Sequence, residues 1–343
     1  MTNLLGMPLT NLEWLMNLQQ RSDDSLRKAL RLRSNKNLIM KLRIFLTISV
    51  LVAFSNRVPA QTAPARSLSP VECVIHGKEK GKNIVESGGL RFQISRKGHD
   101  VYNQFNILRD TKVSGKNVGS FVFRTLPTFD FLDNGAYSKK LHFDLYDYGN
   151  LNGNKDQELI KAGDNLYLTF LVRFMTPAPT PIPGSKFDNE NIKYRRNLFF
   201  QFWPGGVATH FNSYPSGSEE SQQGKFGYVT VLTGDYGTNK PTLSTKYEVE
   251  PKTWYRMYFQ YHPDVTAGRI MAKISAHQPE LKTQDMATII DLKGNTLYAT
   301  KANRRILPTI GNYHWGGCPN MVETQFTEVE ISKSPIPTHL LGQ

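Results

Sequence analysis

Apolar and polar residues alternate with the two-residue repeat of a β-strand along much of the chain after residue 90. Turn-forming clusters, such as residues 150–154 and 176–184, separate these segments. The segments that predict strands are 91–95, 119–124, 140–148, 166–174, 197–203, 226–233, 254–262, 269–276 and 324–332. The sequence after Met40 has no long helical stripe and no alternation of strands with helices. We therefore predict one all-β domain, residues 71–335, built as a sandwich of two antiparallel sheets.

The segment 254–262 predicts two faces, because successive side chains of a strand point to opposite sides. One set is apolar and suits a core between sheets: Tyr255, Met257, Phe259 and Tyr261. The other set combines aromatic, basic and amide groups: Trp254, Arg256, Tyr258, Gln260 and His262. This second face is typical of a surface that binds sugars.

The segment 197–203 repeats this mixture. Strict alternation places Arg195, Asn197, Phe199, Gln201 and Trp203 on one side, and Arg196, Leu198, Phe200 and Phe202 on the other. Aromatic rings stack on the C–H patches of pyranose rings, amides bind hydroxyls, and arginine pairs with a carboxylate or sulfate through two hydrogen bonds. We predict that Arg195, Asn197, Trp203, Arg256, Tyr258, Gln260 and His262 bind the substrate. The alternative is a solvated sheet face.

A targeting segment begins at Met40. Lys41 and Arg43 precede an apolar run, residues 44–54, that is too short to span a bilayer, and small residues precede Gln61. We predict a signal peptide over residues 40–60, with 1–39 as a mis-called extension, 61–70 as a linker and 336–343 as a tail. The alternative for the extension is a short amphipathic helix. The mature protein is expected to be secreted or periplasmic, without a stable membrane anchor.

The two cysteines lie near opposite ends of the mature chain. Export would place Cys73 and Cys318 in an oxidising compartment, where a pair can form a disulfide. A sandwich in which the first and last strands are neighbours would bring them together. The sequence leaves open whether they are bridged.

The charge of the mature chain is modest. The 343 residues contain 42 Lys plus Arg and 29 Asp plus Glu, a formal charge of +13. Residues 1–60 contain 9 basic and 3 acidic residues, which leaves 33 against 26, or +7, for the remainder. Such a surplus suits an acidic polysaccharide, although any soluble domain can carry it. Export argues against nucleic acid as the partner, and we expect a monomer.

Several catalytic patterns are absent from the sequence. Retaining glucanases on such sandwiches present alternating acids along one strand, and no Glu-x-Asp-x-x-Glu run occurs. Glu323, Glu328 and Glu330 come nearest, and we expect them on a solvated face. A zinc-binding His-x-x-x-His, a Gly-x-Ser-x-Gly elbow and a phosphate-binding loop are also missing. Proton transfer by Tyr or His beside a uronate carboxylate stays open.

Three stretches resemble the jelly-roll polysaccharide lyases of the alginate lyase and heparin lyase type, within the concanavalin A-like lectin/glucanase superfamily. Residues 197–203 resemble the central strand of that family, in which Gln is followed two residues later by His; Gln201 matches and Trp203 stands in place of His. Residues 309–313 resemble the Lys-x-Gly-x-Tyr segment; Tyr313 matches and Thr309 replaces Lys. Residues 156–160 resemble the Arg-x-Glu-Leu-Arg strand without its arginines.

The resemblance implies β-elimination of a uronate-containing polysaccharide. Tyr313 would be the acid and, alternatively, the base, and His210 the other candidate base. Gln201, with Arg195 or Arg256, would neutralise the carboxylate. Two alternatives stay open. His210 can be a surface loop residue and Tyr313 a packing residue, in which case the protein is a non-catalytic, lectin-like carbohydrate-binding module.

No cofactor is required by this chemistry. Relatives in the superfamily often carry a structural Ca²⁺, and Asp130, Asp133 and Asn134 in one loop could supply oxygen ligands. We predict no catalytic metal.

Overall fold

The computed structural model describes residues 66–79, 82–88, 90–97, 103–127, 139–148, 162–181, 195–203, 206–233, 242–297, 306–314 and 320–336. The chain divides into a first unit, Met1–Gln61, which lies outside these ranges, and a second unit, Thr62–Gln343, which contains every described element. The predicted extension and signal peptide therefore lie outside the described residues. Within the described ranges, no helix combines the length and apolar character of a membrane span.

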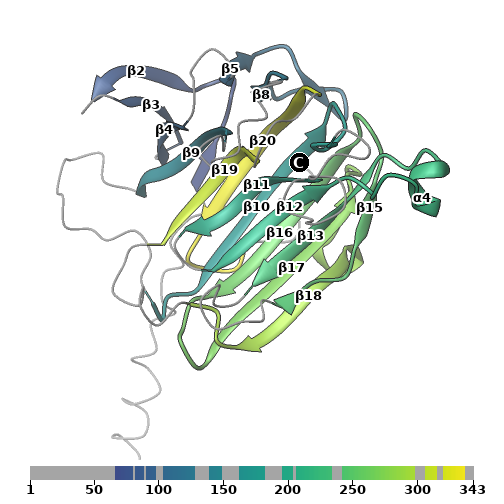
Figure 1. Cartoon of the computed structure of the whole chain (residues 1–343). Coiled ribbons are helices and arrows are strands. Elements are labelled where there is room, and N and C mark those ends of the chain that lie inside the picture. Colours follow the sequence, from purple (N-terminus) through teal and green to yellow (C-terminus); the bar gives the residue numbers. More distant parts are fainter. Residues whose placement is uncertain are drawn as a thin grey trace, which may run out of the picture. The chain divides into compact units, whose positions relative to one another are not determined.

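Antiparallel strands form two large sheets (Figure 1). The eight-stranded sheet has the order β18 (Ala287–Gly294), β17 (Gly268–Ala276), β16 (Trp254–His262), β10 (Leu166–Phe174), β20 (Val322–Ser332), β8 (Ser120–Thr125) and β5 (Asn103–Leu108), and β1 (Arg66–Leu68) also pairs with β20. The ten-stranded sheet has the order β14 (Thr242–Leu243), β13 (Gly227–Thr233), β12 (Val207–Asn212), β11 (Arg196–Trp203), β19 (Leu307–His314), β9 (Lys139–Tyr148), β4 (Leu90–Lys97), β3 (Lys82–Ser87) and β2 (Val74–Glu79), and β15 (Tyr247–Val249) also pairs with β13. The remaining elements are the hairpin of β6 (Lys112–Val113) and β7 (Lys116–Asn117), the helix α4 (Glu219–Gln222) and the 3-10 turn η3 (Thr283–Asp285).

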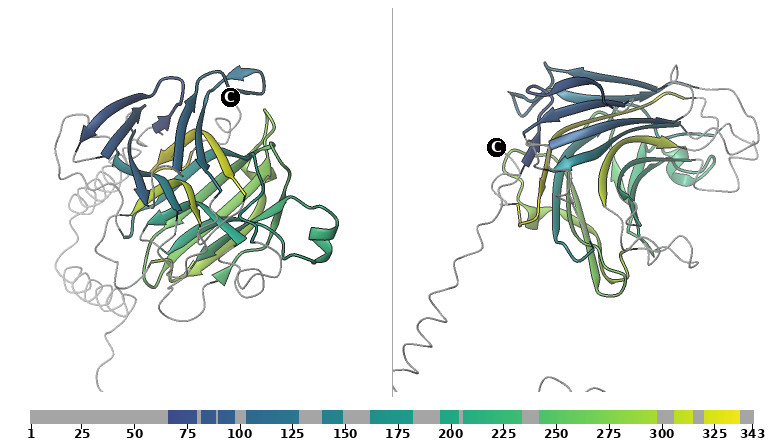
Figure 2. Two further views of the ribbon diagram at one scale, coloured as in Figure 1. Left: turned by 45° about the horizontal axis from the view of Figure 1, so that its top comes forward. Right: turned by 90° about the vertical axis from the view of Figure 1, so that its left-hand side faces the viewer.

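The first and last strands are neighbours. Leu68 of β1 is opposite Val329 of β20, and both side chains are fully buried. Figure 2 shows the purple and blue early strands beside the yellow last strand. The predicted linker is therefore wrong for residues 66–68, because Leu68 anchors this segment in the core. The predicted tail also begins too early, since Ile336 is buried under the eight-stranded sheet.

Aromatic rings fill the space between the two sheets. Phe170 of β10 lies 5.3 Å from Phe200 of β11, and Phe123 of β8 lies 4.8 Å from Phe143 of β9, measured between ring centroids. Each pair joins one sheet to the other. Burial of such rings is the main source of stability in a sandwich, because each removes a large apolar area from water. The predicted all-β jelly-roll sandwich of two antiparallel sheets is confirmed.

The strand predictions succeed where hydrophobic residues alternate. β10 and β16 have the predicted bounds, and the other predicted strands differ by three residues or fewer at each end. The missed strands are short, lie at edges or lack alternation. β12 is an instructive case, because all of its side chains are buried although three of them, Thr209, His210 and Asn212, are polar.

Phe326 of β20 is the best test of this core. Its ring lies 5.5 Å from Phe123, 5.6 Å from Phe170 and 6.3 Å from Phe199. We expect Phe326→Ala to lower the free energy of unfolding by about 3–5 kcal/mol, measured by urea denaturation. The control is Leu243→Ala, because Leu243 is half exposed. Equal losses in the two variants would contradict the packing described.

Candidate functional site

A β-bulge in β11 decides which of its side chains face outward. The pairing of β11 with both β12 and β19 shifts register between Leu198 and Phe200. Phe199 and Phe200 are therefore both fully buried in the core, whereas Leu198 and Gln201 line a cavity on the outer face. An extra residue of this kind reverses the facing of every side chain on one side of it.

The bulge corrects the predicted faces of residues 195–203. Asn197 is fully buried and bonds to Asn312 between the sheets, so it does not bind substrate from the outer face. Arg196 lines the cavity instead, although alternation assigned it to the opposite face from Gln201. Arg195 is 9% exposed, and its carbonyl accepts a hydrogen bond from the backbone N–H of Ser213. It does not line the cavity.

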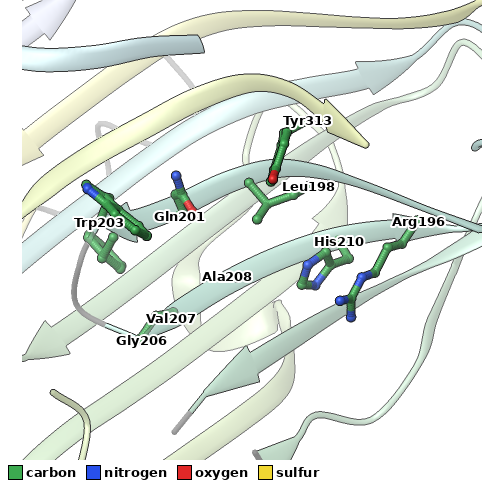
Figure 3. A pocket seen from close by; sticks show the side chains of 10 residues that line it. Arg196, Leu198, Gln201, Trp203, Gly206, Val207, Ala208, His210 and Tyr313 are labelled. Carbon is green, nitrogen blue, oxygen red and sulfur yellow. The ribbon is translucent and has the colours of Figure 1, made fainter. Parts of the chain in front are cut away.

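The cavity has a volume of about 230 Å³ and lies on the outer face of the ten-stranded sheet. In Figure 3 its side chains extend from Trp203 at one end to Arg196 beside His210 at the other, with Tyr313 next to Leu198 between them. The lining residues are Arg196, Leu198, Gln201, Phe202, Trp203, Gly206, Val207, Ala208, His210 and Tyr313. All three predicted catalytic residues, Tyr313, His210 and Gln201, are among them, as is Trp203. The indole of Trp203 is 53% exposed, so it can offer its face to a sugar ring at the cavity mouth.

Leu198 forms the floor between the two proton-transfer candidates. It is opposite Tyr313 on one side and His210 on the other. Neighbouring strands lie about 4.8 Å apart, so the backbones of His210 and Tyr313 are separated by about 10 Å. In Figure 3 the Tyr313 hydroxyl points toward Leu198.

His210 is a buried strand residue, so the alternative of a surface loop histidine is wrong. Its side chain lies on β12 and is 3% exposed. Burial, reinforced by the positive charge of Arg196, holds the pKa of His210 well below its usual range. The imidazole is therefore neutral at pH 7, and one of its ring nitrogens carries a lone pair that can accept a hydrogen bond.

The residues predicted on β16 lie on the other sheet. Their alternation is as predicted, because Tyr255, Met257, Phe259 and Tyr261 are core residues. The opposite set faces outward from the eight-stranded sheet and does not meet the cavity, so Arg256, Tyr258, Gln260 and His262 are wrong as substrate-binding partners of Gln201. Strand order, which alternation does not reveal, separates the two surfaces.

The four outward-facing side chains of β16 already form contacts within the chain. Arg256 is 1% exposed and forms an ion pair with Glu328. Tyr258 is buried together with Leu281, Met286 and Ile336, and burial raises its pKa to about 12. The amide of Gln260 lies 3.5 Å from the Tyr167 hydroxyl, and the Nδ1 of His262 lies 3.1 Å from the Asp164 carbonyl.

The three glutamates of β20 do not form a solvated face. Glu323 is 7% exposed and pairs with Arg124 at 2.7 Å. Glu328 pairs with Arg256, and burial raises the pKa of Glu330. The prediction that these carboxylates are solvated is wrong, because segments of the chain cover this face of the eight-stranded sheet. They lie away from the cavity and offer it no catalytic pair.

Most residues of the predicted calcium loop and disulfide lie outside the described ranges. Within the described ranges, no group of His, Cys, Asp and Glu side chains is arranged to hold a metal ion. The loop of Asp130, Asp133 and Asn134 lies outside those ranges, as does the segment 156–160. Cys73 is buried, its thiol donates to the Pro70 carbonyl, and burial raises its pKa. Cys318 lies outside the described residues, so the disulfide stays a prediction.

Comparisons with known proteins give similar folds. No protein-family model matches the sequence, and no match was found among curated proteins. The catalytic domain of a glycoside hydrolase family 131 protein from Coprinopsis cinerea is 13% identical, with 74% of this chain and 86% of that chain covered and a TM-score of 0.44. A double mutant of alginate lyase Aly36B in complex with an alginate tetrasaccharide is 11% identical, with 80% and 98% covered and a TM-score of 0.41. A β-glucanase catalytic domain of family 131 from Podospora anserina is 11% identical, with 73% and 88% covered and a TM-score of 0.40.

These neighbours have jelly-roll folds. Their identities and TM-scores are low, so the likeness carries no information on the activity of this chain. Function has to be inferred from the cavity itself.

The pKa of His210 predicts how stability depends on pH. Since the folded state resists protonation, the unfolded chain binds more protons below about pH 6.5, and the free energy of unfolding falls as the pH drops. One such group contributes at most about 1.4 kcal/mol per pH unit. We expect His210→Gln to make the loss of stability between pH 7 and pH 5 shallower, measured by urea denaturation at each pH. An unchanged slope would contradict the buried, neutral imidazole.

Proposed function

We propose that the cavity on the ten-stranded sheet binds an acidic polysaccharide and cleaves it by β-elimination beside a uronate carboxylate. The observation that carries this proposal is the meeting of Tyr313, His210, Arg196 and Gln201 around one floor residue, Leu198. A proton acceptor, a proton donor and two groups that can bind a carboxylate are the parts that this reaction needs.

The proton transfers follow from the two side chains that flank Leu198. The neutral imidazole of His210 accepts the proton from the carbon beside the carboxylate. The electron pair of that C–H bond forms the new carbon–carbon double bond, and the bond to the glycosidic oxygen breaks. The Tyr313 hydroxyl donates its proton to the leaving oxygen. The separation of about 10 Å between the two backbones allows each group to act from its own side of the ring.

The other lining residues bind and orient the uronate. The guanidinium of Arg196 pairs with the carboxylate and stabilises the negative charge that develops on it as the proton leaves. The Gln201 amide donates a further hydrogen bond to the same group. Trp203 stacks on the neighbouring sugar at the cavity mouth, where its indole is exposed.

A non-catalytic carbohydrate-binding module is the second candidate. It is favoured by Trp203, which stands where the resembled lyases have His and which suits binding better than proton transfer. Export, predicted from residues 40–60, agrees with both candidates because polysaccharides lie outside the cell. Secretion or periplasmic location remains a proposal that rests on the sequence.

The reaction is tested with the form that begins near Gln61. We expect that form to release unsaturated uronates, detected by absorbance near the ultraviolet limit, from at least one of alginate, glucuronan, heparin, hyaluronan and pectate. Tyr313→Phe should lower the turnover number by about 100-fold or more, because it removes the proton donor, and should leave binding unchanged. Tyr258→Phe is the matched control, since this tyrosine lies on the other sheet, and it should keep full activity.

Two results would overturn the lyase proposal. Wild-type protein that binds an acidic glycan but forms no product on this panel is a carbohydrate-binding module. A Tyr313→Phe variant with normal turnover on a cleaved substrate would remove Tyr313 from the mechanism.

A further inference from the structure

A buried pair of asparagines lies directly behind the cavity. Asn197 of β11 and Asn312 of β19 are both fully buried in a core that is otherwise rich in phenylalanine. The Asn197 amide nitrogen donates to the Asn312 side-chain carbonyl at 2.9 Å. Two buried amides are costly unless they are fully bonded, so their presence in the core calls for a function.

The pair holds the backbone of Tyr313. The side-chain oxygen of Asn197 accepts a hydrogen bond from the backbone N–H of Tyr313 at 3.0 Å. This contact lies at the register shift of β11 and β19, where Gly311 adopts a φ of 146° that favours glycine. A side chain therefore helps to fix the main chain at the point where regular pairing is interrupted.

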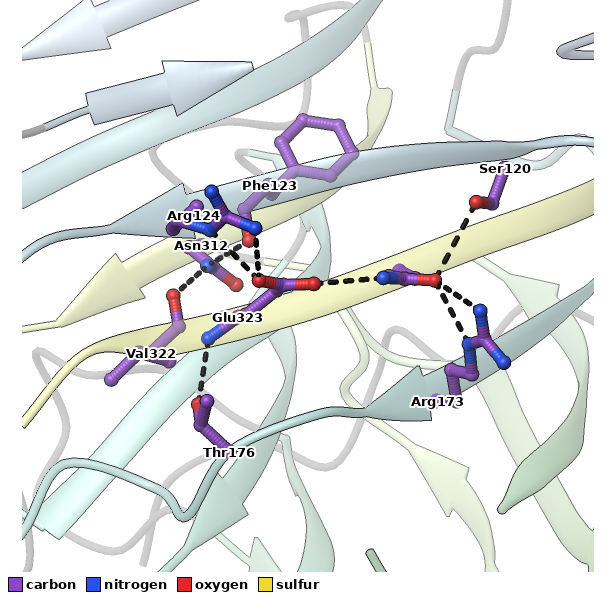
Figure 4. Close-up of polar contacts among 9 residues, drawn as sticks. Ser120, Phe123, Arg124, Arg173, Thr176, Asn312, Val322 and Glu323 are labelled. Carbon is purple, nitrogen blue, oxygen red and sulfur yellow. Dashed lines mark hydrogen bonds and ion pairs between the residues drawn. The ribbon is translucent and has the colours of Figure 1, made fainter. Parts of the chain in front are cut away.

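The pair also connects Tyr313 to the opposite sheet. The Asn312 amide nitrogen donates to the carbonyls of Phe123 at 2.9 Å and Val322 at 3.2 Å, on β8 and β20 (Figure 4). The Asn197 amide nitrogen also lies 3.4 Å from the Thr324 hydroxyl on β20. Hydrogen bonds thus run from the eight-stranded sheet through the core to the residue that faces the cavity.

The outer face of the eight-stranded sheet fixes the far end of this path. Glu323, next to Val322, accepts from Arg124 and from the Gln325 amide at 2.8 Å each, and its backbone N–H donates to Thr176 at 2.8 Å. Gln325 in turn accepts from Arg173 at 2.7 Å (Figure 4). The carbonyls that receive Asn312 therefore belong to strands held by charged side chains.

We propose that Asn197 and Asn312 are positioning residues, which hold Tyr313 at the height and angle that its hydroxyl needs over Leu198. The inference rests on the proposed function for the reaction that Tyr313 performs. Neither asparagine lines the cavity, so both act through the backbone of Tyr313. A displacement of about 1 Å at a reacting group can cost about 100-fold in rate, which makes such support significant.

The test compares two variants of the same hydrogen-bond cluster. Asn197→Leu has a similar volume and removes the acceptor for the Tyr313 N–H. Thr324→Val is the matched control, because it removes a buried partner of Asn197 and leaves the contact to Tyr313 in place. We expect Asn197→Leu to lower kcat by about 10- to 100-fold with KM within about threefold of wild type. Thr324→Val should keep kcat within about twofold of wild type, although its loss of Tm is expected to be comparable with that of Asn197→Leu.

A second readout does not depend on activity. Hydrogen exchange of the Tyr313 amide should accelerate in Asn197→Leu and stay protected in Thr324→Val. If wild-type protein forms no product, the proposed function fails, and this exchange decides the positioning inference alone. If Asn197→Leu does not fold, Asn312→Ser replaces it, because it removes the carbonyl that anchors the Asn197 amide.

The inference is overturned if the two variants lose kcat in parallel with their Tm, since the asparagines would then only stabilise the fold. It is equally overturned if the Tyr313 amide exchanges at the same rate in Asn197→Leu and wild type.

Discussion

The β-bulge at Phe199 is the constraint on which the cavity depends. Two consecutive phenylalanines enter the core there, which regular alternation forbids, and Leu198 and Gln201 are both left on the outer face. Phe199 and Phe200 pack against Phe174 and Phe259 of the opposite sheet, with ring centroids 5.2 Å and 4.6 Å apart. Because aromatic packing fixes the bulge, the positions of the cavity residues follow from the stability of the core.

The outer faces of the two sheets differ. The side chains of one face bond to each other, whereas the other face has an open cavity. On the eight-stranded sheet, Arg256 forms an ion pair with Glu328 and Arg124 forms one with Glu323. Loop residues such as Met286 cover the surface. On the ten-stranded sheet, a cavity stays open with a neutral imidazole, a phenol and a guanidinium around it. The first arrangement serves folding, whereas the second is the site at which we propose that an acidic sugar binds.

Sequence patterns predicted the fold better than the site, for physical reasons that particular strands illustrate. Alternation located β10 and β16 because an apolar core residue stands at every second position of each strand, such as Phe170 in β10 and Phe259 in β16. It failed on β11, since a bulge leaves no mark in residue type, and Asn197 and Arg196 were therefore assigned to the wrong faces. It missed β12 because that strand is short and Thr209 stands between its two core residues, Val207 and Phe211, so His210 was not assigned to a strand. It could not place Arg256, because strand order depends on contacts far apart in the chain. Tyr313 and Gln201 were found through short motifs of a known family, which record local chemistry that alternation does not contain.

The central claim is that the carboxylate of a uronate lies against Arg196 while its ring covers Leu198. A crystal structure of the Tyr313→Phe variant with a bound uronate tetrasaccharide tests this claim most directly. We predict one sugar ring between Phe at position 313 and His210, with its carboxylate within hydrogen-bond distance of the Arg196 guanidinium and the Gln201 amide. A tetrasaccharide bound to the outer face of the eight-stranded sheet, or bound in the cavity with its carboxylates turned away from Arg196, would contradict the account.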